Sequence, residues 1–330
     1  MSYKGKSIKF LISCLIILSG AGLHGASGHI IRVVSICFNQ GSKSVEAICR
    51  LIDKEAEAGV DLICLPEAWT GYHPESVEGN TIKQIAGLAK KHHTYIVCPL
   101  ILKRKGSVFN TSILIARDGT ISGIYDKIFP YWSELEGEYP VQPGQNDAAV
   151  FETDFGKIGL AICYDAKFPE VFKRLCNRQA DLVVWSSAYS GFTELQAYAT
   201  LNHYYIVTST WTGDCLVYDI NGQNLLDMNE KKDITIARYE LDMDRQIYHY
   251  NFNQDKLKKL LSEHGDEVSV DIDMPREEWF VLKSKNVQFS SRQLARQYGL
   301  EPLRMYIERS REHIDTLRGF DFNQKYNGNP

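Results

Sequence analysis

Strand-like and helix-like patterns of apolar residues alternate from residue 30 to about residue 102. Continuous apolar, β-branched runs predict buried strands, and apolar residues at spacings of three and four predict helices with one covered face. Ser44 precedes the first helical pattern as an N-cap, and Gly59 follows it as a stop. The predicted elements, alternately strand and helix, are Ile31–Phe38, Val45–Ala56, Asp61–Leu65, Thr81–His92 and Tyr95–Leu102. These are β-α-β units, so we expect a sheet covered by helices.

Hairpins follow in the middle of the chain. Two strand patterns, Asn110–Arg117 and Thr120–Tyr125, flank Asp118-Gly119, a dipeptide typical of a tight hairpin turn. Asn221-Gly222 predicts a similar turn. Because hairpins are mixed with β-α-β units, the sequence predicts an α/β fold with mixed rather than purely parallel sheets.

The pattern weakens beyond residue 242. Residues 246–273 are polar and give no clear element, whereas Ser291–Tyr298 and Glu301–Leu317 predict two amphipathic helices. We therefore expect a main domain at residues 30–270, and a C-terminal helical extension and tail at residues 271–330.

The N-terminus has the pattern of an export signal. Three lysines precede the apolar stretch Phe10–Leu18, and small residues follow it. The stretch is too short to span a bilayer comfortably, which predicts removal of a signal peptide at residues 1–26 and no membrane attachment afterwards. Cleavage follows Ala21 or falls near Ala26, and we expect a secreted or periplasmic protein.

Composition excludes several classes of function. Hydrophobic residues make up 44% and charged residues 24%, an ordinary globular mixture, and no Lys or Arg cluster interleaves with aromatic residues, so no nucleic-acid partner is expected. The chain has eight cysteines without a Cys-x-x-Cys pair, so neither a metal site nor a cofactor is expected. Most cysteines lie in or beside apolar runs, which indicates buried thiols rather than a disulfide framework.

Three reactive side chains follow the ends of predicted strands. Glu67 follows the run at residues 62–66, Lys127 follows the second hairpin strand, and Cys163 ends the run Ile158–Ile162. Singly, they have ordinary explanations as a turn carboxylate, a solvated lysine and a core cysteine. Together, at strand ends where the sites of such sheets gather, they supply a base, an oxyanion-stabilising cation and a nucleophile for acyl transfer.

The segments around these residues resemble the three signature blocks of the nitrilase, or carbon–nitrogen hydrolase, superfamily. They are Leu65–Trp69, Tyr125–Pro130 and Gly159–Glu170, and their order and spacing also match. The resemblance covers residues 30–241. It implies a four-layer α-β-β-α sandwich and assembly as a homodimer or higher homo-oligomer, often extended by the C-terminal segment.

The resemblance also implies a Glu-Lys-Cys catalytic set. Cys163 is then the nucleophile, and we expect Glu67 to act as general base and acid. Lys127 and the backbone N–H of Tyr164 are expected to hold the oxyanion.

The superfamily has a second glutamate near its lysine. We choose Glu136, because Glu-Gly-x-Tyr-Pro resembles the amidase branch. Glu134 remains an alternative for the same role, because a small shift in the alignment with the superfamily would select it instead. Trp132 and Tyr189 are our aromatic candidates for substrate binding. Three further aromatic residues that could line the pocket are Tyr139, Phe192 and Trp211.

The residues after the nucleophile bear on the substrate. True nitrilases of the superfamily tend to carry Trp-Glu there, and this chain has Tyr164-Asp165. We therefore expect a small amide or N-carbamoyl compound, cleaved with release of ammonia or an amine. The alternatives are nitrile hydrolysis at the same site, a papain-like hydrolase with His203 as base, and a non-catalytic binding protein on this fold.

Overall fold

The computed structural model of the chain describes residues 30–322, except residues 146–148 and 231. The predicted signal peptide at residues 1–26 and the last residues of the predicted tail, 323–330, lie outside the described residues. No helix in the described part of the chain is long and apolar enough to cross a membrane.

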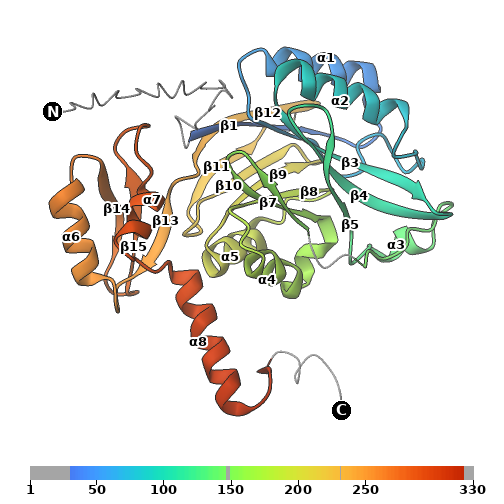
Figure 1. Ribbon diagram of the computed structural model, residues 1–330. Helices are drawn as coiled ribbons and strands as arrows, with labels where there is room; N and C mark the ends of the chain where they lie inside the picture. The colour runs from blue at the N-terminus through green and yellow to red at the C-terminus, as the bar shows by residue number, and fades with distance from the viewer. Residues whose placement is uncertain (1–29, 146–148, 231, 323–330) are drawn as a thin grey trace, which may run out of the picture.

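Two six-stranded mixed sheets form the centre of the molecule (Figure 1). In spatial order the first sheet contains β12 (Ile234–Asp242), β1 (Ile30–Phe38), β2 (Leu62–Cys64), β3 (Tyr95–Arg104), β4 (Ser107–Ile115) and β5 (Ile121–Asp126). The second contains β11 (Asn224–Asn229), β10 (Asp214–Tyr218), β9 (Tyr205–Thr210), β8 (Leu182–Ser187), β7 (Gly156–Ile162) and β6 (Val150–Thr153). Each sheet has three parallel strands in its middle and antiparallel neighbours outside them.

Helices cover the outer face of each sheet (Figure 1). The first sheet is covered by α1 (Val45–Ala56) and α2 (Asn80–His92), and the second by α4 (Pro169–Asn177) and α5 (Phe192–Asn202). Buried side chains of α1 and α2, including Ile48, Ile52 and Ile85, pack against the first sheet, and a larger apolar core lies between the sheets. The predicted four-layer α-β-β-α sandwich is confirmed.

Local sequence signals explain several boundaries. The Ser44 side chain accepts a hydrogen bond from the backbone N–H of Ala47 at 3.2 Å, as expected of the N-cap of α1. Gly119 has a φ of +85° in the β4–β5 turn, a conformation that side chains disfavour. A Cβ at that position would also lie 2.7 Å from the Ala86 carbonyl oxygen.

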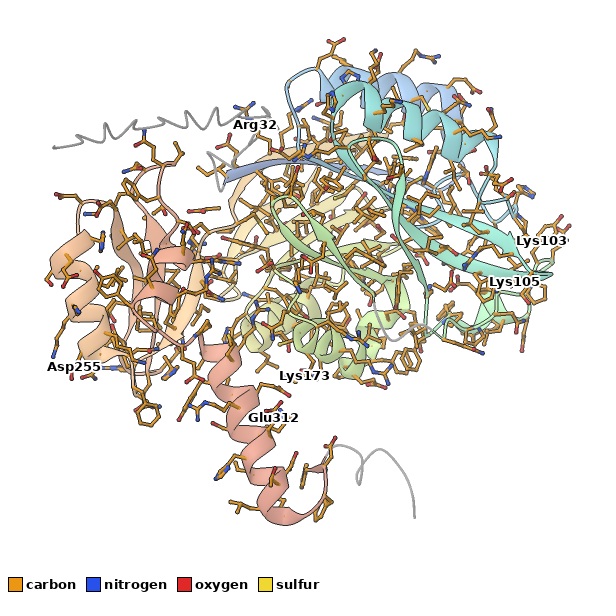
Figure 2. All side chains as sticks on the ribbon, in the orientation of Figure 1. Arg32, Lys103, Lys105, Lys173, Asp255 and Glu312 are labelled. Carbon is orange, nitrogen blue, oxygen red and sulfur yellow. The ribbon has the colours of Figure 1, made fainter. Side chains whose placement is uncertain are left out.

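The C-terminal part differs from the expectation. It forms a three-stranded antiparallel sheet of β13 (Gln246–His249), β15 (Trp279–Ser284) and β14 (Val268–Met274), with α6 (Gln254–His264) and α7 (Ser291–Gln297). The boundary that we placed between residues 270 and 271 therefore lies inside β14. We call residues 246–300 the C-terminal unit. It lies beside the sandwich, with Asp255 of α6 on its outer side (Figures 1 and 2).

A last helix, α8 (Leu303–Arg318), leaves this unit and extends away from both sheets (Figure 1). It confirms the predicted helix at Glu301–Leu317, and α7 confirms the one at Ser291–Tyr298. As a whole residue, no member of α8 is buried in this single chain, although the Arg304 side chain is only 9% exposed.

Candidate active site

The three strand-end residues meet at one edge of the sandwich. Glu67 follows β2, Lys127 follows β5, and Cys163 follows β7 in the opposite sheet. All three contribute to a cavity of about 490 Å³. The cavity is lined by Gln40, Glu67, Tyr72, His73, Lys127, Tyr131, Ser133, Glu134, Gly137, Glu138, Tyr139, Cys163, Ala188 and Trp211.

A buried network of charged groups forms the floor of the cavity. Lys127 Nζ donates to Glu67 Oε1 at 2.8 Å and to Glu134 Oε2 at 2.6 Å, and all three side chains are at most 3% exposed. Asn110 Nδ2 bridges the same carboxylates, donating to Glu67 Oε1 at 2.8 Å and Glu134 Oε1 at 2.7 Å. These contacts fix both carboxylates around the lysine.

One oxygen of the network has no partner. Glu67 Oε1 accepts from both Lys127 and Asn110, whereas Glu67 Oε2 is buried without a hydrogen bond from any described residue. A buried carboxylate oxygen is normally satisfied, because leaving it unpaired costs free energy. This oxygen is therefore available to accept a proton from a group inside the cavity.

Cys163 stands at a sharp turn between β7 and the short helix η1 (Cys163–Lys167). Its φ of +43° is unusual for a residue other than glycine and costs conformational energy, which the surroundings must offset. Asp165 supplies much of that support: its carboxylate accepts from the backbone N–H of Ile162 and Phe129 and from the Tyr125 hydroxyl, at 2.9, 3.0 and 2.7 Å.

The environment keeps Cys163 protonated and Lys127 charged. Burial, together with the charge of Glu67, raises the pKa of the Cys163 thiol to about 12, although Lys127 acts in the opposite direction. Burial alone would lower the pKa of Lys127, but Glu67, Cys163 and Glu134 outweigh it and raise that pKa well above its ordinary value. A thiol in this state needs a base for attack, since the thiolate is the nucleophile.

The choice of Glu136 as second glutamate is wrong in geometric terms. Glu134 contacts Lys127, whereas Glu136 is exposed and does not line the cavity. The reason is the short helix α3 (Trp132–Leu135), which begins after Tyr131. Glu134 turns back to accept from the Tyr131 backbone N–H at 2.7 Å, and this bond points its carboxylate inward.

Two aromatic candidates also lie elsewhere. Trp132 is 61% exposed, and Tyr189 turns its hydroxyl to Glu194 at 3.1 Å, so neither lines the cavity. Phe192 does not line it either, whereas Tyr139 and Trp211 do. The aromatic prediction was therefore correct for two of the five residues.

The remaining sequence candidates are placed as follows. The Tyr164 ring packs edge-on against Tyr131 and Phe168, and its backbone N–H belongs to the first turn of η1, where N–H groups lack helical partners. His203 ends α5 and lies at a separate small cavity beside Asp181 and Arg304, which removes it as a base for Cys163.

Sequence reasoning missed several residues of the site. Asn110 opens the predicted strand Asn110–Arg117, and only its contact with both carboxylates reveals a role. Tyr72, His73 and Gln40 lie on loops without a pattern of their own. Among the described residues, no group of three or more His, Cys, Asp or Glu side chains could hold a metal ion.

Comparison with known proteins decides the family. The family model described as carbon–nitrogen hydrolase matches residues 37–247, well over half of the chain. The chain belongs to the carbon–nitrogen hydrolase family. This makes it an enzyme of the class that hydrolyses non-peptide carbon–nitrogen bonds.

This carbon–nitrogen hydrolase has curated relatives that are named amidases. It is 28% identical over 237 residues to a deaminated glutathione amidase from Synechocystis, covering 60% of this chain and 86% of the relative. It is 27% identical over 190 residues to omega-amidase NIT2 from Xenopus tropicalis, covering 51% of this chain and 69% of the relative.

Solved structures share the fold of this hydrolase. A carbon–nitrogen hydrolase from Helicobacter pylori superposes with a TM-score of 0.58 at 19% identity, over 66% of this chain and 91% of the other. An amidase variant from Nesterenkonia, in which acrylamide has added to the active-site cysteine, superposes with a TM-score of 0.56 at 20% identity, over 63% and 92%. The family model ends at residue 247, so nearly all of the C-terminal unit lies outside it.

Proposed function

We propose that this carbon–nitrogen hydrolase is an amidase that cleaves a small amide or N-carbamoyl compound through a thioester on Cys163. One observation carries the proposal: a buried, unpaired oxygen of Glu67 lies in the same cavity as the Cys163 thiol and beside the charged Lys127. This is a nucleophile with a base and a cation in a site largely shielded from water, the set that acyl transfer requires.

The first half of the reaction forms the thioester. Cys163 Sγ attacks the carbonyl carbon while its proton passes to Glu67 Oε2. The carbonyl oxygen becomes an oxyanion, which Lys127 Nζ and the Tyr164 backbone N–H stabilise, and one such donor contributes on the order of 3 kcal/mol. Glu67 then returns the proton to the nitrogen, and ammonia or an amine leaves.

The second half releases the acid. Water loses a proton to Glu67 and attacks the thioester carbon, and the same donors hold the second oxyanion. The carbon–sulfur bond breaks and the thiol regains its proton from Glu67. An amide substrate leaves as its carboxylic acid, and an N-carbamoyl substrate leaves as carbamic acid, which decomposes to carbon dioxide and ammonia. General acid–base catalysis of this kind contributes about 10²–10⁴-fold in each half. Glu134 and Asn110 act here by holding Glu67 and Lys127 in place.

The lining supports a small substrate without its own carboxylate. The floor carries two carboxylates for one ammonium group, and Glu138 adds a third carboxylate to the lining. No arginine lines the cavity in the described part of the chain, so an anionic substrate would meet like charge without a bidentate partner. Amide chemistry also agrees with the names of the curated relatives.

The test is a panel of small primary amides, N-carbamoyl compounds and nitriles, scored by ammonia release for the wild type and Cys163→Ala. We expect turnover of amides or carbamoyl compounds, a hydroxamate when hydroxylamine is present, and a loss of at least about 10³-fold in the variant. Faster turnover of nitriles would overturn the substrate class. Substantial activity in Cys163→Ala would overturn the mechanism, and a wild type inert toward the whole panel would favour the binding protein.

Two further proposals come from the sequence. Export to the periplasm or outside the cell, after removal of a signal peptide, is tested by N-terminal sequencing of the mature protein. Assembly into a homodimer or larger homo-oligomer is tested by sedimentation of the purified chain at several concentrations. A monomer at all concentrations would refute the second proposal.

A further inference from the structure

Two cysteines outside the active site meet across the interface between the large sheets. Cys37 lies on β1 of the first sheet and Cys215 on β10 of the second, 178 residues apart in the chain. Both side chains are fully buried, and their Sγ atoms lie 2.6 Å apart. The structure carries both as thiols.

Hydrogen bonds join the two sheets at this point. The Cys37 sulfur accepts a hydrogen bond from the Thr210 backbone N–H of β9 at 3.3 Å. One residue earlier on each strand, Ser209 Oγ donates to the Ile36 carbonyl oxygen at 2.7 Å. These hydrogen bonds hold β1 against β9, which is the neighbour of β10 in the second sheet, and so keep the Cys37 sulfur beside Cys215.

The packing around the sulfurs is apolar. Ala237 completes the buried cluster, and Leu226, Met228 and Tyr239 pack against it. The contact with Cys37, and then burial, raises the pKa of Cys215 far above its ordinary value, so Cys215 is an uncharged thiol. Such a pair has no role in the chemistry at Cys163, and neither residue lines the active-site cavity.

We propose that Cys37 and Cys215 are joined by a disulfide bond that links the two sheets of the sandwich. A bonded pair of sulfurs lies about 2.05 Å apart, so the two side chains need to move by only about half an ångström to close the bond. Oxidising compartments allow such bonds to persist, and the proposed export would place the chain in one. The proximity of the two sulfurs is independent of the proposed amidase activity.

The oxidation balances as a thiol–disulfide exchange. One cysteine attacks a disulfide oxidant, either a protein oxidoreductase or oxidised glutathione, and releases the first thiol of the oxidant. The second cysteine then attacks the mixed disulfide and releases the second thiol. The two cysteines lose two protons and two electrons, and the oxidant gains them. Because both sulfurs are buried in the folded chain, the exchange takes place before the sheets have closed.

The bond would brace one wall of the active-site cavity. Gln40 lies three residues after Cys37 and Trp211 follows Thr210, and both line the cavity. A covalent link between β1 and β10 also closes a long loop in the unfolded chain and lowers its conformational entropy, which is the usual explanation of disulfide stabilisation.

Peptide mapping of the full-length wild type tests the bond directly. The chain is refolded with oxidised and reduced glutathione, alkylated, and digested with trypsin without reduction. Cleavage after Lys and Arg places Cys37, Cys64 and Cys215 in separate peptides, residues 33–43, 55–83 and 179–231. We expect the first and third peptides to be linked. Separate, alkylated peptides would overturn the proposal, and so would a bond from either cysteine to Cys64.

Thermal unfolding supplies an independent measurement. We expect oxidised wild type to melt roughly 5–10 °C above wild type that was refolded with dithiothreitol. Cys215→Ala should lose this redox-dependent difference, whereas Cys98→Ala, which removes an equally buried strand cysteine outside the pair, should retain it. An equal difference in Cys215→Ala and wild type would refute the bond. If Cys215→Ala does not fold, the peptide map of the wild type still decides.

Discussion

Two regions of this hydrolase contain buried charges that are arranged differently. In the active-site cavity, Lys127 lies between Glu67 and Glu134, and one oxygen of Glu67 accepts no hydrogen bond from the described residues. Where the C-terminal unit and α8 meet the sandwich, Asp181 accepts from Arg292 at 2.7 Å and from the Lys157 backbone N–H at 2.9 Å. Both carboxylate oxygens of Asp181 are therefore occupied.

The difference separates a reactive arrangement from a structural one. Around Asp181 the cations outnumber the anion, since Arg304 lies 3.9 Å away and also donates to the Ala180 carbonyl oxygen at 2.6 Å. The carboxylate there has a partner on each oxygen, and the proximity of Arg292 and Arg304 lowers its pKa despite burial. In the cavity the anions outnumber the cation, and capacity for one proton remains on Glu67.

The largest predicted effect is on the unpaired oxygen. Glu67→Gln keeps the shape of the side chain but removes the base, so we expect kcat to fall by about 10³-fold or more. Thermal unfolding should change little by comparison. Steady-state ammonia release and a melting curve of the same preparation measure both. Activity within tenfold of wild type would mean that Glu67 is no more reactive than Asp181.

A second prediction concerns the structural region. Asp181→Asn leaves Arg292 and Arg304 buried without their counter-ion, and we expect the free energy of unfolding to fall by about 3 kcal/mol. The kcat of the folded protein should remain within about twofold, because the site lies away from Cys163. Asp255→Asn, on the exposed outer side of α6 (Figure 2), is the matched control. Urea unfolding that gave equal stability for both variants would contradict a structural role of Asp181.

The third prediction separates the two candidate glutamates. Glu134→Gln weakens the positioning of Lys127, so we expect kcat to fall by about 10²-fold. Glu136→Gln should have wild-type kinetics, because its carboxylate is exposed and does not line the cavity. Kinetics of the two variants under identical conditions provide the measurement. A larger loss of kcat in Glu136→Gln than in Glu134→Gln would contradict the assignment of Glu134 as the glutamate that positions Lys127.

The smallest effect concerns His203, which belongs to the structural region. Burial, with a contribution from Arg304, lowers its pKa from 6.5 to about 4. A histidine with a lowered pKa contributes stability that is present above pH 6.5 and is lost as the pH falls toward 4. At pH 5 the loss amounts to about 2 kcal/mol relative to pH 8.

His203→Asn tests this pH dependence. Asparagine tolerates the left-handed conformation that His203 adopts at the end of α5, with φ of +57°. Urea unfolding at pH 8 and pH 5 should show a smaller difference in the variant than in wild type. His313→Asn, at an exposed position of α8, should leave the wild-type difference unchanged. If His203→Asn and wild type showed the same difference in the free energy of unfolding between pH 8 and pH 5, His203 would not be the cause of that pH dependence.

The sequence predicted those features that depend on short-range patterns. Apolar runs and the Asp118-Gly119 turn located five of the six strands of the first sheet, all except β12, and the three signature blocks located Glu67, Lys127 and Cys163. The position of Glu134 could not be predicted in the same way, because it depends on where a helix of only four residues begins. The hydrogen bond from the Tyr131 backbone N–H to Glu134 fixes where α3 begins and therefore which glutamate points into the cavity. Glu134 and Glu136 are so close in sequence that the motif alone does not distinguish them.

The C-terminal unit is a different case, since part of its signal was present in the sequence. Residues 268–274 alternate strictly between apolar and polar side chains, which is typical of a strand with one covered face. Because much of residues 246–273 is polar, we did not assign a strand to this alternation. The Asp181 cluster could not be predicted at all, because Asp181 lies more than 100 residues from Arg292 and Arg304 and meets them only in the folded chain.

Trp211 gives the protein an optical reporter of its own active site. Its indole N–H donates to the Glu67 backbone carbonyl at 2.6 Å, and its side chain forms part of the cavity lining. A fixed indole emits according to the polarity around it, and a substrate that displaces water from the cavity changes that polarity. Binding and acylation can therefore be followed in real time by intrinsic fluorescence on the unlabelled enzyme, with Cys163→Ala isolating the binding phase.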